Sequence, residues 1–539
     1  MAQKKNTSIR SSVTNQIASL HHEHPSYRWW VLLNVMIGTF MAVLDSTIVN
    51  VSLPKIMATF GASVDKAEWI LTGYLLVFAV MLPSSGWIAD HFGYKRTYML
   101  SFALFTFGSF LCGLAWDENA LIAFRVVQGL GGGLMMPIGM AIVLREFPIE
   151  QRGTALGFWG ISAAASVSFG PLAGGYLVDN FSWHSIFDVN VPIGIVGIFA
   201  TYIIQREYKT ETTRDFDVVG FLSVTVFLTS ILLALTDGNA SWNDGGWTSP
   251  FILWCFAISI IALTVFLITE FTVNHPLIDL TLFKYYNYSM SNVVLFIFGF
   301  AIFGSTFLLP LYLQNSLSYT ATQVGLLFLP AGIVQGLMSP VSGLMGDKLN
   351  PKVPAVLGMI FLCISWYMNT TLSLYSSHSD IMIPLYLRGI GLGLLFTPLS
   401  SLAYSDIPKT KMAQASGLFN VIRQIGGSFG VAVVGTLLST QTLKHMQING
   451  QVINIHSPSV QQVVNNLKHF AGQSQGGTAA VSSQQAQALL GSHLSNQAFV
   501  QGVDDVFMFS FFIIAFGIIP LLFLRTPKKT SGETHMALE

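Results

Sequence analysis

Charged residues are scarce in this chain, which argues against most classes of soluble protein. Asp, Glu, Lys and Arg together make up 10% of the 539 residues, whereas hydrophobic residues make up 52%. Soluble domains carry about 25% charged residues, so soluble cores cannot hold this many apolar side chains. The 26 basic residues balance the 26 acidic ones, and the net charge therefore does not indicate nucleic acid as a partner. We expect an all-α polytopic membrane protein surrounded by lipid.

Cysteine is also rare, and familiar catalytic signatures are missing. The three cysteines all fall in apolar runs, so a disulfide framework is not expected. The sequence contains no Gly-x-x-x-x-Gly-Lys-Ser/Thr loop of the kind that binds nucleotide phosphates, which disfavours ATP as an energy source. It also contains no paired acids, metal-ligand helix motif or nucleophile constellation at one membrane depth. The sequence therefore does not predict an enzyme.

Long apolar runs are abundant. Fourteen of them, each about 17–26 residues long, can cross roughly 30 Å of hydrocarbon as helices. They cover residues 30–50, 69–89, 98–115, 120–144, 153–178, 187–205, 217–235, 251–271, 289–313, 323–345, 353–373, 382–404, 414–437 and 504–525. With the N-terminus in the cytoplasm, nineteen of the 26 Lys and Arg residues lie in cytoplasmic segments and four on the opposite side. Because cytoplasmic loops carry an excess of these residues, both termini are expected in the cytoplasm.

A short polar turn occurs twice in the chain. Residues 86–96 join two apolar runs, and Gly86 and Asp90 reappear as Gly343 and Asp347, each 257 residues later. Two matching turns, each after the second helix of a half, are typical of transporters built from repeated halves. The alternative is a coincidence between two ordinary charged turns of membrane helices.

The duplication predicts six helices, two inserted helices and six further helices. The expected segments are a cytoplasmic N-terminal tail (1–29), an N-terminal six-helix half (30–205), an inserted helix pair (217–271), a C-terminal six-helix half (289–525) that includes an external loop (438–503), and a cytoplasmic tail (526–539). The first tail contains His21, His22 and His24. A solvated tail is favoured over a metal site there, because no Cys or helix fixes the geometry of these histidines.

Asp45 is the clearest candidate for function inside the membrane. A charge at mid-membrane costs on the order of 3 kcal/mol, and Asp45 is the only acid well inside a span. A carboxylic acid shielded from water can bind and release a proton as its access alternates between the two sides. The alternative is a structural carboxylate held by Ser46, Thr47 or an Arg.

Arg125 and Arg388 lie within spans at corresponding places in the two halves, and Arg423 is a third arginine of this kind. Buried cations need partners, so Arg125 is expected to pair with a carboxylate, an anionic substrate or a carbonyl-lined cavity. We assign proton coupling to Asp45 and Arg125, and we regard Arg388 and Asp347 as second-half counterparts. The alternative for the arginines is a charge clamp between helices.

Small residues mark the fifth span, namely Gly170, Pro171, Gly174 and Gly175. Small side chains let helices approach closely, and proline removes a backbone hydrogen bond and permits a kink. We therefore expect this part of the span to pack tightly against another helix.

Taken together, residues 30–525 resemble the major facilitator superfamily, and within it the fourteen-helix drug:proton antiporters of the EmrB/QacA type. The residues that match the gating loop of the superfamily are Gly86, Asp90, Gly93, Lys95 and Arg96. The fifth-span residues Gly170, Pro171, Gly174 and Gly175 resemble the antiporter motif. The sequence departs from the usual residues at His91, Tyr94, Ser166 and His184.

The resemblance implies proton-coupled efflux of hydrophobic or amphipathic compounds by alternating access across the cytoplasmic (inner) membrane, and hence drug resistance. It implies no bound cofactor, since the proton gradient supplies the energy. Asp90 is expected to latch the cytoplasmic side through the N-terminus of the next helix or a nearby Arg. The alternatives are a lipid or metabolite exporter of the same fold and a proton-coupled uptake symporter, against which the fifth-span motif argues.

The external loop 438–503 is expected to be a docking surface, with short helices at 460–470 and 483–490. The resemblance implies a periplasmic membrane-fusion adaptor as one partner, in a host with an outer membrane. The alternative is a passive insertion.

Overall fold

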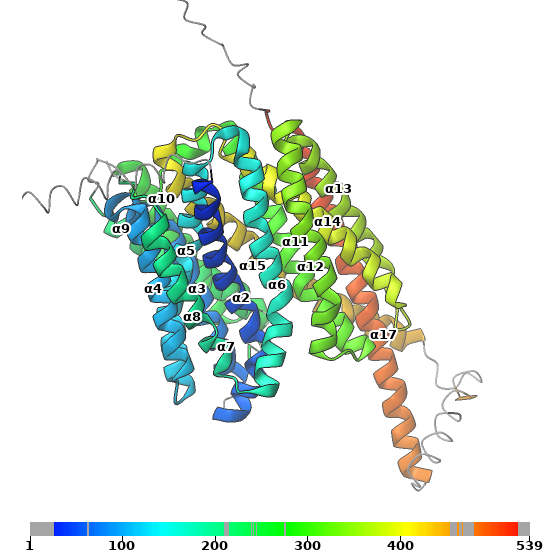
Figure 1. Ribbon diagram of the computed structural model, residues 1–539. Coiled ribbons are helices and arrows are strands. Elements are labelled where there is room, and N and C mark those ends of the chain that lie inside the picture. Colours follow the sequence, from blue (N-terminus) through cyan, green and yellow to red (C-terminus); the bar gives the residue numbers. More distant parts are fainter. Residues whose placement is uncertain are drawn as a thin grey trace, which may run out of the picture.

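A computed structural model gives the fold and describes residues 26–61, 64–209, 215–238, 240, 242–243, 245–273, 276–452, 461–462, 466 and 479–526. These residues form helices and loops, with no strand among them (Figure 1). The expectations for the tail histidines and for residues 527–539 lie outside the described residues, as does most of 453–478. The expectation of an all-α polytopic protein is confirmed.

The helices follow one another in the order expected from the apolar runs. The long ones are α2 (Tyr27–Phe60), α3 (Val64–Phe92), α4 (Tyr94–Gly113), α5 (Glu118–Glu146), α6 (Arg152–Asn180), α8 (Asn190–Ile204), α9 (Val218–Asp237), α10 (Pro250–Thr272), α11 (Tyr286–Leu317), α12 (Ala321–Lys348), α13 (Lys352–Met368), α14 (His378–Ala403), α15 (Met412–Val452) and α17 (Ala479–Phe516). Short helices are α7 (Ser185–Asp188), α18 (Ile518–Phe523), η1 (Ile149–Gln151), η2 (Gly246–Thr248), η3 (Leu280–Lys284), η4 (Asn369–Thr371) and η5 (Lys409–Lys411).

Twelve helices in the described part of the chain are long and apolar enough to cross a membrane, and α6 makes a thirteenth if its two arms form one span. The arms of α6 meet at an angle of 41° between Val167 and Leu172. The Gly170-Pro171 pair lies at this bend, where a proline removes a backbone hydrogen bond. The expected span at 98–115 corresponds to α4, which is not among the thirteen although it is 20 residues long.

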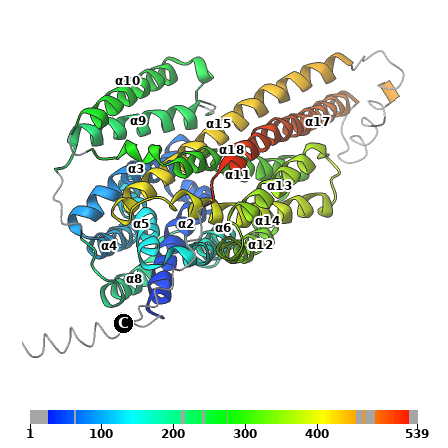
Figure 2. The ribbon, with the colours of Figure 1, turned by 90° about the horizontal axis from the view of Figure 1, so that it is seen from above.

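Two groups of helices lie side by side. Helices α2–α8 form the first group and α11–α17 the second, and α9 with α10 lies beside α3 at the edge of the first group (Figures 1 and 2). The groups meet along two seams, α6 against α12 and α3 against α15. Buried apolar side chains are continuous through both groups, from Val31 of α2 to Phe507 of α17. We call the end that carries the α3–α4 and α12–α13 turns the turn end.

Helices α15 and α17 differ from the prediction, because each extends beyond its expected span into the expected external loop. Helix α15 continues to Val452 and α17 begins at Ala479, and α17 projects beyond the other helices in Figure 1. The two extensions hold each other through polar contacts. His445 Nε2 lies 2.8 Å from Asp505 Oδ2, and Asn449 Nδ2 donates to Gln501 Oε1 at 2.9 Å. The proposed short helix at 483–490 is thus part of a long one.

Candidate proton-coupling and gating sites

Asp45 lies at the centre of a polar network inside the first group of helices. Its side chain is fully buried, and Arg125 Nη1 of α5 donates to Asp45 Oδ2. Gln128 Nε2 donates to Asp45 Oδ1 at 2.8 Å, and Asn190 Nδ2 of α8 donates to the same oxygen at 3.3 Å. Two helices, α5 and α8, therefore supply this carboxylate of α2 with three donors, one of them charged.

Arg125 is also well satisfied. Its Nε donates to the carbonyl of Ile70 at 3.2 Å, and its Nη1 also donates to Gln128 Oε1 at 2.6 Å. Its guanidinium carbon lies 4.1 Å from the centroid of the Tyr74 ring, a cation–π geometry. A buried ion pair with this many hydrogen bonds acts as a unit, since removing either charge leaves the other uncompensated in a low dielectric. The site can therefore serve as a structural clamp, a proton site, or both in turn.

Several residues of this network are uncharged, so the sequence analysis did not identify them as site residues. Gln128 also donates to Ser109 Oγ at 2.7 Å, so it links α4 to the ion pair. In the sequence, only its position one helical turn after Arg125 indicated that Gln128 lies near the ion pair. Asn190 carried only the general expectation that a polar residue within an apolar span faces other helices.

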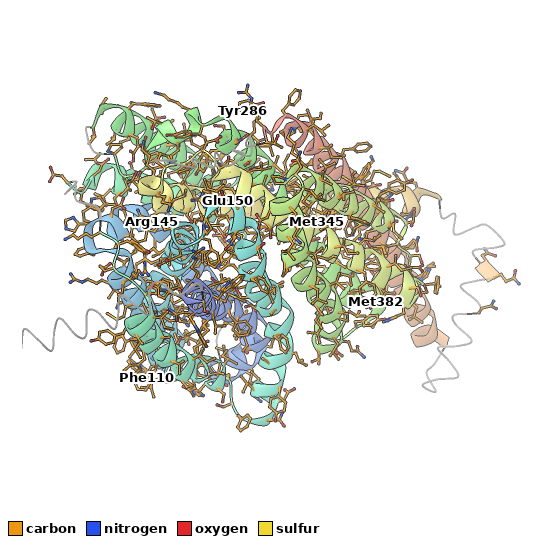
Figure 3. The ribbon with its side chains drawn as sticks, turned by 45° about the horizontal axis from the view of Figure 1, so that its top comes forward. Phe110, Arg145, Glu150, Tyr286, Met345 and Met382 are labelled. Carbon is orange, nitrogen blue, oxygen red and sulfur yellow. The ribbon has the colours of Figure 1, made fainter. Side chains whose placement is uncertain are left out.

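The α3–α4 turn holds Asp90 within the first group of helices. Tyr94 Oη donates to Asp90 Oδ1 at 3.1 Å, and Arg145 Nη2 of α5 lies 4.0 Å from the same oxygen. Arg145 also stacks on the Tyr94 ring, with its guanidinium carbon 4.0 Å from the centroid. A nearby Arg was one of the two partners expected for Asp90, and Tyr94 replaces the usual basic residue as a further partner. Figure 3 shows Arg145, Glu150 and Met345 near the turn end, with Phe110 and Met382 toward the opposite end.

Glu207 anchors the same turn from outside it, and the sequence did not predict this role. Gly93 has a φ of +96°, a conformation that favours glycine, and a Cβ there would overlap the Glu207 carboxylate. Lys95 N donates to Glu207 Oε1 at 3.1 Å, and Arg96 Nε lies 3.6 Å from Glu207 Oε2. Tyr94 N donates to the Tyr208 carbonyl at 3.0 Å. The segment after α8 thus binds the first turn of α4.

The second turn makes its contacts across the α6–α12 seam. Asp347 at the end of α12 accepts from Gly153 N at 3.0 Å, Thr154 N at 2.7 Å and Thr154 Oγ1 at 2.6 Å. A carboxylate at a helix N-terminus interacts favourably with free N–H groups and the helix dipole. On the other seam, a Cβ on Gly86 would lie 2.9 Å from Gln414 Cα, so α3 and α15 are in close contact. The turn end is therefore closed between the two groups.

The glycines of the fifth span pack against the helix that carries Asp45. A Cβ on Gly170 would collide with Thr47 Oγ1, and one on Gly174 would lie 3.0 Å from the carbonyl oxygen of Ile48. Gly175 faces the other way, since its Cβ would lie 4.0 Å from Thr322 Oγ1 of α12. Glycine at these positions therefore lets α6 approach α2 beside the ion pair and reach the seam.

Arg388 has a different environment from Arg125. It is buried in α14, its Nη2 donates to Thr306 Oγ1 at 2.7 Å, and its guanidinium carbon lies 5.3 Å from the Phe328 ring centroid. Arg423 of α15 lies 5.9 Å from the Phe396 ring centroid. Neither arginine is within ion-pair distance of a carboxylate in the part of the chain that the structure describes. The expected counterpart is present, but without the acid that Arg125 has.

Two groups of membrane-length helices with buried charges inside each are typical of a membrane transporter. Comparisons with known proteins agree, since residues 35–431 match the family described as Major Facilitator Superfamily. The chain is 31% identical to the multidrug export protein EmrB of Haemophilus influenzae over 493 residues, which covers 91% of this chain and 93% of that protein. It is 30% identical over 507 residues to YhcA, an uncharacterized MFS-type transporter of Bacillus subtilis, covering 93% of each.

Solved structures show the same fold. The human organic anion transporter MFSD10 superposes with a TM-score of 0.58 at 12% identity, covering 91% of this chain and 100% of that one. At this identity the likeness concerns the fold alone. The chain belongs to the major facilitator superfamily, in the drug:proton antiporter family of the EmrB type.

Proposed function

We propose that the protein is a proton-coupled multidrug efflux antiporter that exports hydrophobic and amphipathic compounds across the cytoplasmic membrane by alternating access. The observation that carries the proposal is the fully buried Asp45, paired with Arg125 inside one half. Protonation of Asp45 would remove one charge of the pair, leave Arg125 uncompensated and weaken the contact between α2 and α5. The multidrug export function named for the EmrB relative supports an outward direction of transport.

The gating part of the proposal concerns the turn end. With this end in the cytoplasm, Asp347 on the α6 N-terminus and Gly86 against α15 would hold the cytoplasmic side closed. Substrate would then leave on the other side, and proton binding at Asp45 would favour release of these contacts. We assign Asp90, Lys95 and Arg96 to the same gate, acting through Arg145 and Glu207.

The proposed topology has fourteen spans and both termini in the cytoplasm. Helix α4 would be the fourteenth, because it is 20 residues long and packs against α5 and α8 as the other spans do. Reporter fusions that are active only in the cytoplasm, placed after Glu539 and after Trp116, test this topology. Activity at the first site and none at the second is expected, and the reverse would contradict it.

Gradient-driven dye transport tests the function. The purified protein is reconstituted into liposomes with an acidic lumen, and dyes from a hydrophobic panel are added outside. Antiport predicts that dye accumulates in the lumen as protons leave, without ATP, and that nigericin abolishes the accumulation. A symporter would require the opposite gradient, and transport that ignores the gradient would contradict proton coupling.

The extensions of α15 and α17 support a partner as well. We propose that they, with the residues between them, form a docking surface for a periplasmic adaptor in a host with two membranes. Replacing residues 445–498 with a short Gly/Ser linker should leave dye transport in liposomes intact, since the proton site lies in the spans. Drug resistance of a two-membrane host should fall. Full resistance at normal protein levels would favour a passive extension.

A further inference from the structure

We propose that Phe187 of the short helix α7 is the gate that separates the Asp45–Arg125 pair from the outer solution. The inference rests on the proposed function and names the path by which a proton reaches its binding site. Phe187 is fully buried, and its ring centroid lies 5.8 Å from the guanidinium carbon of Arg125, within the range of a cation–π contact. Three residues further along the chain, Asn190 Nδ2 donates to Asp45 Oδ1 at 3.3 Å. The same short stretch of chain therefore contacts both members of the pair.

The ion pair lies closer to the end of the molecule opposite the turn end. Helix α5 reaches the turn end at Arg145, which contacts Asp90, and it begins at Glu118 on the opposite side. At about 1.5 Å per residue, Arg125 is about 10 Å from the start of α5 and about 30 Å from its end. Helix α7 lies at the nearer end, toward the bottom of the first group in Figure 1. A proton from the outer solution thus has its shorter path to Asp45 past α7.

A cluster of buried apolar side chains adjoins the pair at this end. Its members include Ile48, Ile70 and Leu121 of long helices and Trp183, Ile186 and Phe187 of the segment between α6 and α8. The carbonyl of Ile70 also accepts the Arg125 Nε hydrogen bond, at 3.2 Å. Asp188, the residue after Phe187, is exposed. The outer solution therefore begins one residue beyond the ring that contacts Arg125, and the apolar cluster separates it from the pair.

Helix α7 is the part of this cluster that can move without moving a membrane span. It has only four residues, Ser185–Asp188, which is too few for a helix that is stable by itself. Trp183 before it is 3% exposed, and its Nε1 has no hydrogen-bond partner within the described chain. A buried donor without a partner costs free energy, and outward movement of α7 would bring this donor to water. Apolar packing therefore holds α7 in the closed position, although that position leaves a polar group unsatisfied.

The gate acts on a single proton. When the Phe187 ring moves aside, a proton from the outer solution binds one carboxylate oxygen of Asp45, and the charge of Arg125 is no longer balanced. When the ring is in place, Asp45 can communicate with the turn end alone. Alternating access requires that the site never opens to both sides at once. Loss of the ring should therefore create a continuous proton path whenever the turn end is open.

Proton flux in the absence of any drug tests the gate. The purified full-length protein is reconstituted into liposomes that contain the pH indicator pyranine, and a proton gradient is imposed. Phe187→Ala should carry protons about tenfold faster than the wild type, because loss of a buried ring favours the open form. Phe187→Leu keeps an apolar side chain and should leak less than Phe187→Ala. Adding Asp45→Asn to Phe187→Ala should abolish the extra flux, since the protons pass through this carboxylate.

Phe124→Ala is the matched control. Phe124 packs against the same cluster and directly precedes Arg125, but its ring faces Trp116, with the two ring centroids 5.6 Å apart. This variant should leak no more than the wild type. An unchanged flux in Phe187→Ala, an equal leak in Phe124→Ala, or a leak that survives Asp45→Asn would each overturn the proposal.

A disulfide between α4 and α7 gives a second test, which does not depend on whether Phe187→Ala folds. A Cβ on Gly113 would lie 3.3 Å from Asp188 Cγ, the position that a cysteine sulfur would take, so Gly113→Cys with Asp188→Cys can form the bond. Serine replaces the native cysteines Cys112, Cys255 and Cys363. Gradient-driven dye transport should stop in the oxidised protein, and dithiothreitol should restore it. Full transport by protein whose cross-link is confirmed by mass spectrometry would overturn the proposal.

The gate and the proposed function fail in different experiments. Gradient-driven dye transport by the wild type, without extra proton flux in Phe187→Ala, would remove the gate and leave the antiporter. An Asp45-dependent leak in Phe187→Ala, from a wild type that moves no dye, would keep the gate and remove the antiporter.

Discussion

The two halves of the molecule have an arginine at corresponding points, but the side chains around the two arginines differ. Arg125 has a carboxylate, an amide and a backbone carbonyl around it, all from its own half. Arg388 has a single hydroxyl acceptor and a cavity beside it. Among the described residues, only Arg125 of these two arginines lies within ion-pair distance of a carboxylate.

The two polar turns also differ in the partners of their aspartates. Asp90 of the first half contacts Tyr94 and Arg145, which belong to the same half, whereas Asp347 of the second half reaches across the seam to Gly153 and Thr154. The two carboxylates therefore differ in their partners, although both turns touch the other group, since Gly86 of the first turn lies against Gln414 of α15.

The largest effect is expected from Asp45→Asn. This variant keeps the shape of the side chain but replaces one acceptor oxygen by an amide group and removes the titratable group, so gradient-driven efflux should fall to background while expression and substrate binding stay largely intact. Dye accumulation in acid-lumen liposomes measures the first, and equilibrium binding the second. Undiminished proton-linked efflux in this variant would remove Asp45 from the mechanism.

The two arginines give the next largest effect, on stability. Arg125→Gln leaves Asp45 buried and unpaired and should lower the free energy of unfolding by about 3–5 kcal/mol. Arg388→Gln removes one hydrogen bond and no ion pair, and should cost about 1 kcal/mol or less. Chemical unfolding of the purified proteins in mixed micelles compares them.

The double variant Asp45→Asn with Arg125→Gln is the control for this comparison. It should recover part of the stability lost in Arg125→Gln, because no unpaired charge remains. Similar losses for Arg125→Gln and Arg388→Gln would mean that the halves do not differ in the way the contacts indicate.

The turns should differ by a smaller amount. Asp347→Asn weakens bonds across the seam at a helix N-terminus, worth about 1 kcal/mol, and so should change the population of the closed turn end about fivefold. Asp90→Asn, the matched variant, should slow turnover with less change in population. Distances between spin labels on opposite sides of the seam measure both, and the native cysteines Cys112, Cys255 and Cys363 are buried. A larger shift in the population of the closed turn end in Asp90→Asn than in Asp347→Asn would contradict the assignment of the seam contacts to Asp347.

Glu207 should give the smallest effect. Glu207→Ala removes the acceptor for Lys95 N and the partner of Arg96, and turnover should fall by a factor of about two to five. Glu207→Gln keeps an acceptor and should be close to wild type, because exposed ion pairs contribute about 0–1 kcal/mol. Liposome turnover at saturating dye measures both variants. A loss in Glu207→Gln as large as in Glu207→Ala would show that the charge, not the hydrogen bond, matters.

The order of the helices could be predicted from the sequence, and an arginine was one of the partners considered for Asp45. Long apolar runs specify membrane helices because the bilayer leaves few alternatives, and an isolated charge in such a run demands a partner. Gln128 and Asn190 could not be predicted with the same force, since an uncharged amide is tolerated in many positions. The role of Glu207 could not be predicted, because its contact with Gly93 depends on the path that the chain takes after α8.

The extensions of α15 and α17 show a second limit. The polar composition of residues 438–503 suggested a loop with short helices, because hydropathy was the only signal available. Polar residues extend a helix when a second helix supplies partners, as Asp505 does for His445 and Gln501 for Asn449. The sequence has no local pattern that reports such a contact.

The inserted helix pair, α9 with α10, has a consequence for the rate of transport. Trp247 Nε1 at the tip of this pair donates to Thr436 Oγ1 of α15 at 2.7 Å, and α9 also packs against α3. The pair is thus attached to both sides of one seam. If the halves rock as rigid bodies, the inserted pair can move with only one of them. Its contacts with the other half must then break and re-form in every cycle. Such slippage acts as friction: it raises the barrier between the two end states without favouring either, so this pair would govern how fast the molecule turns over rather than how far it can concentrate a substrate.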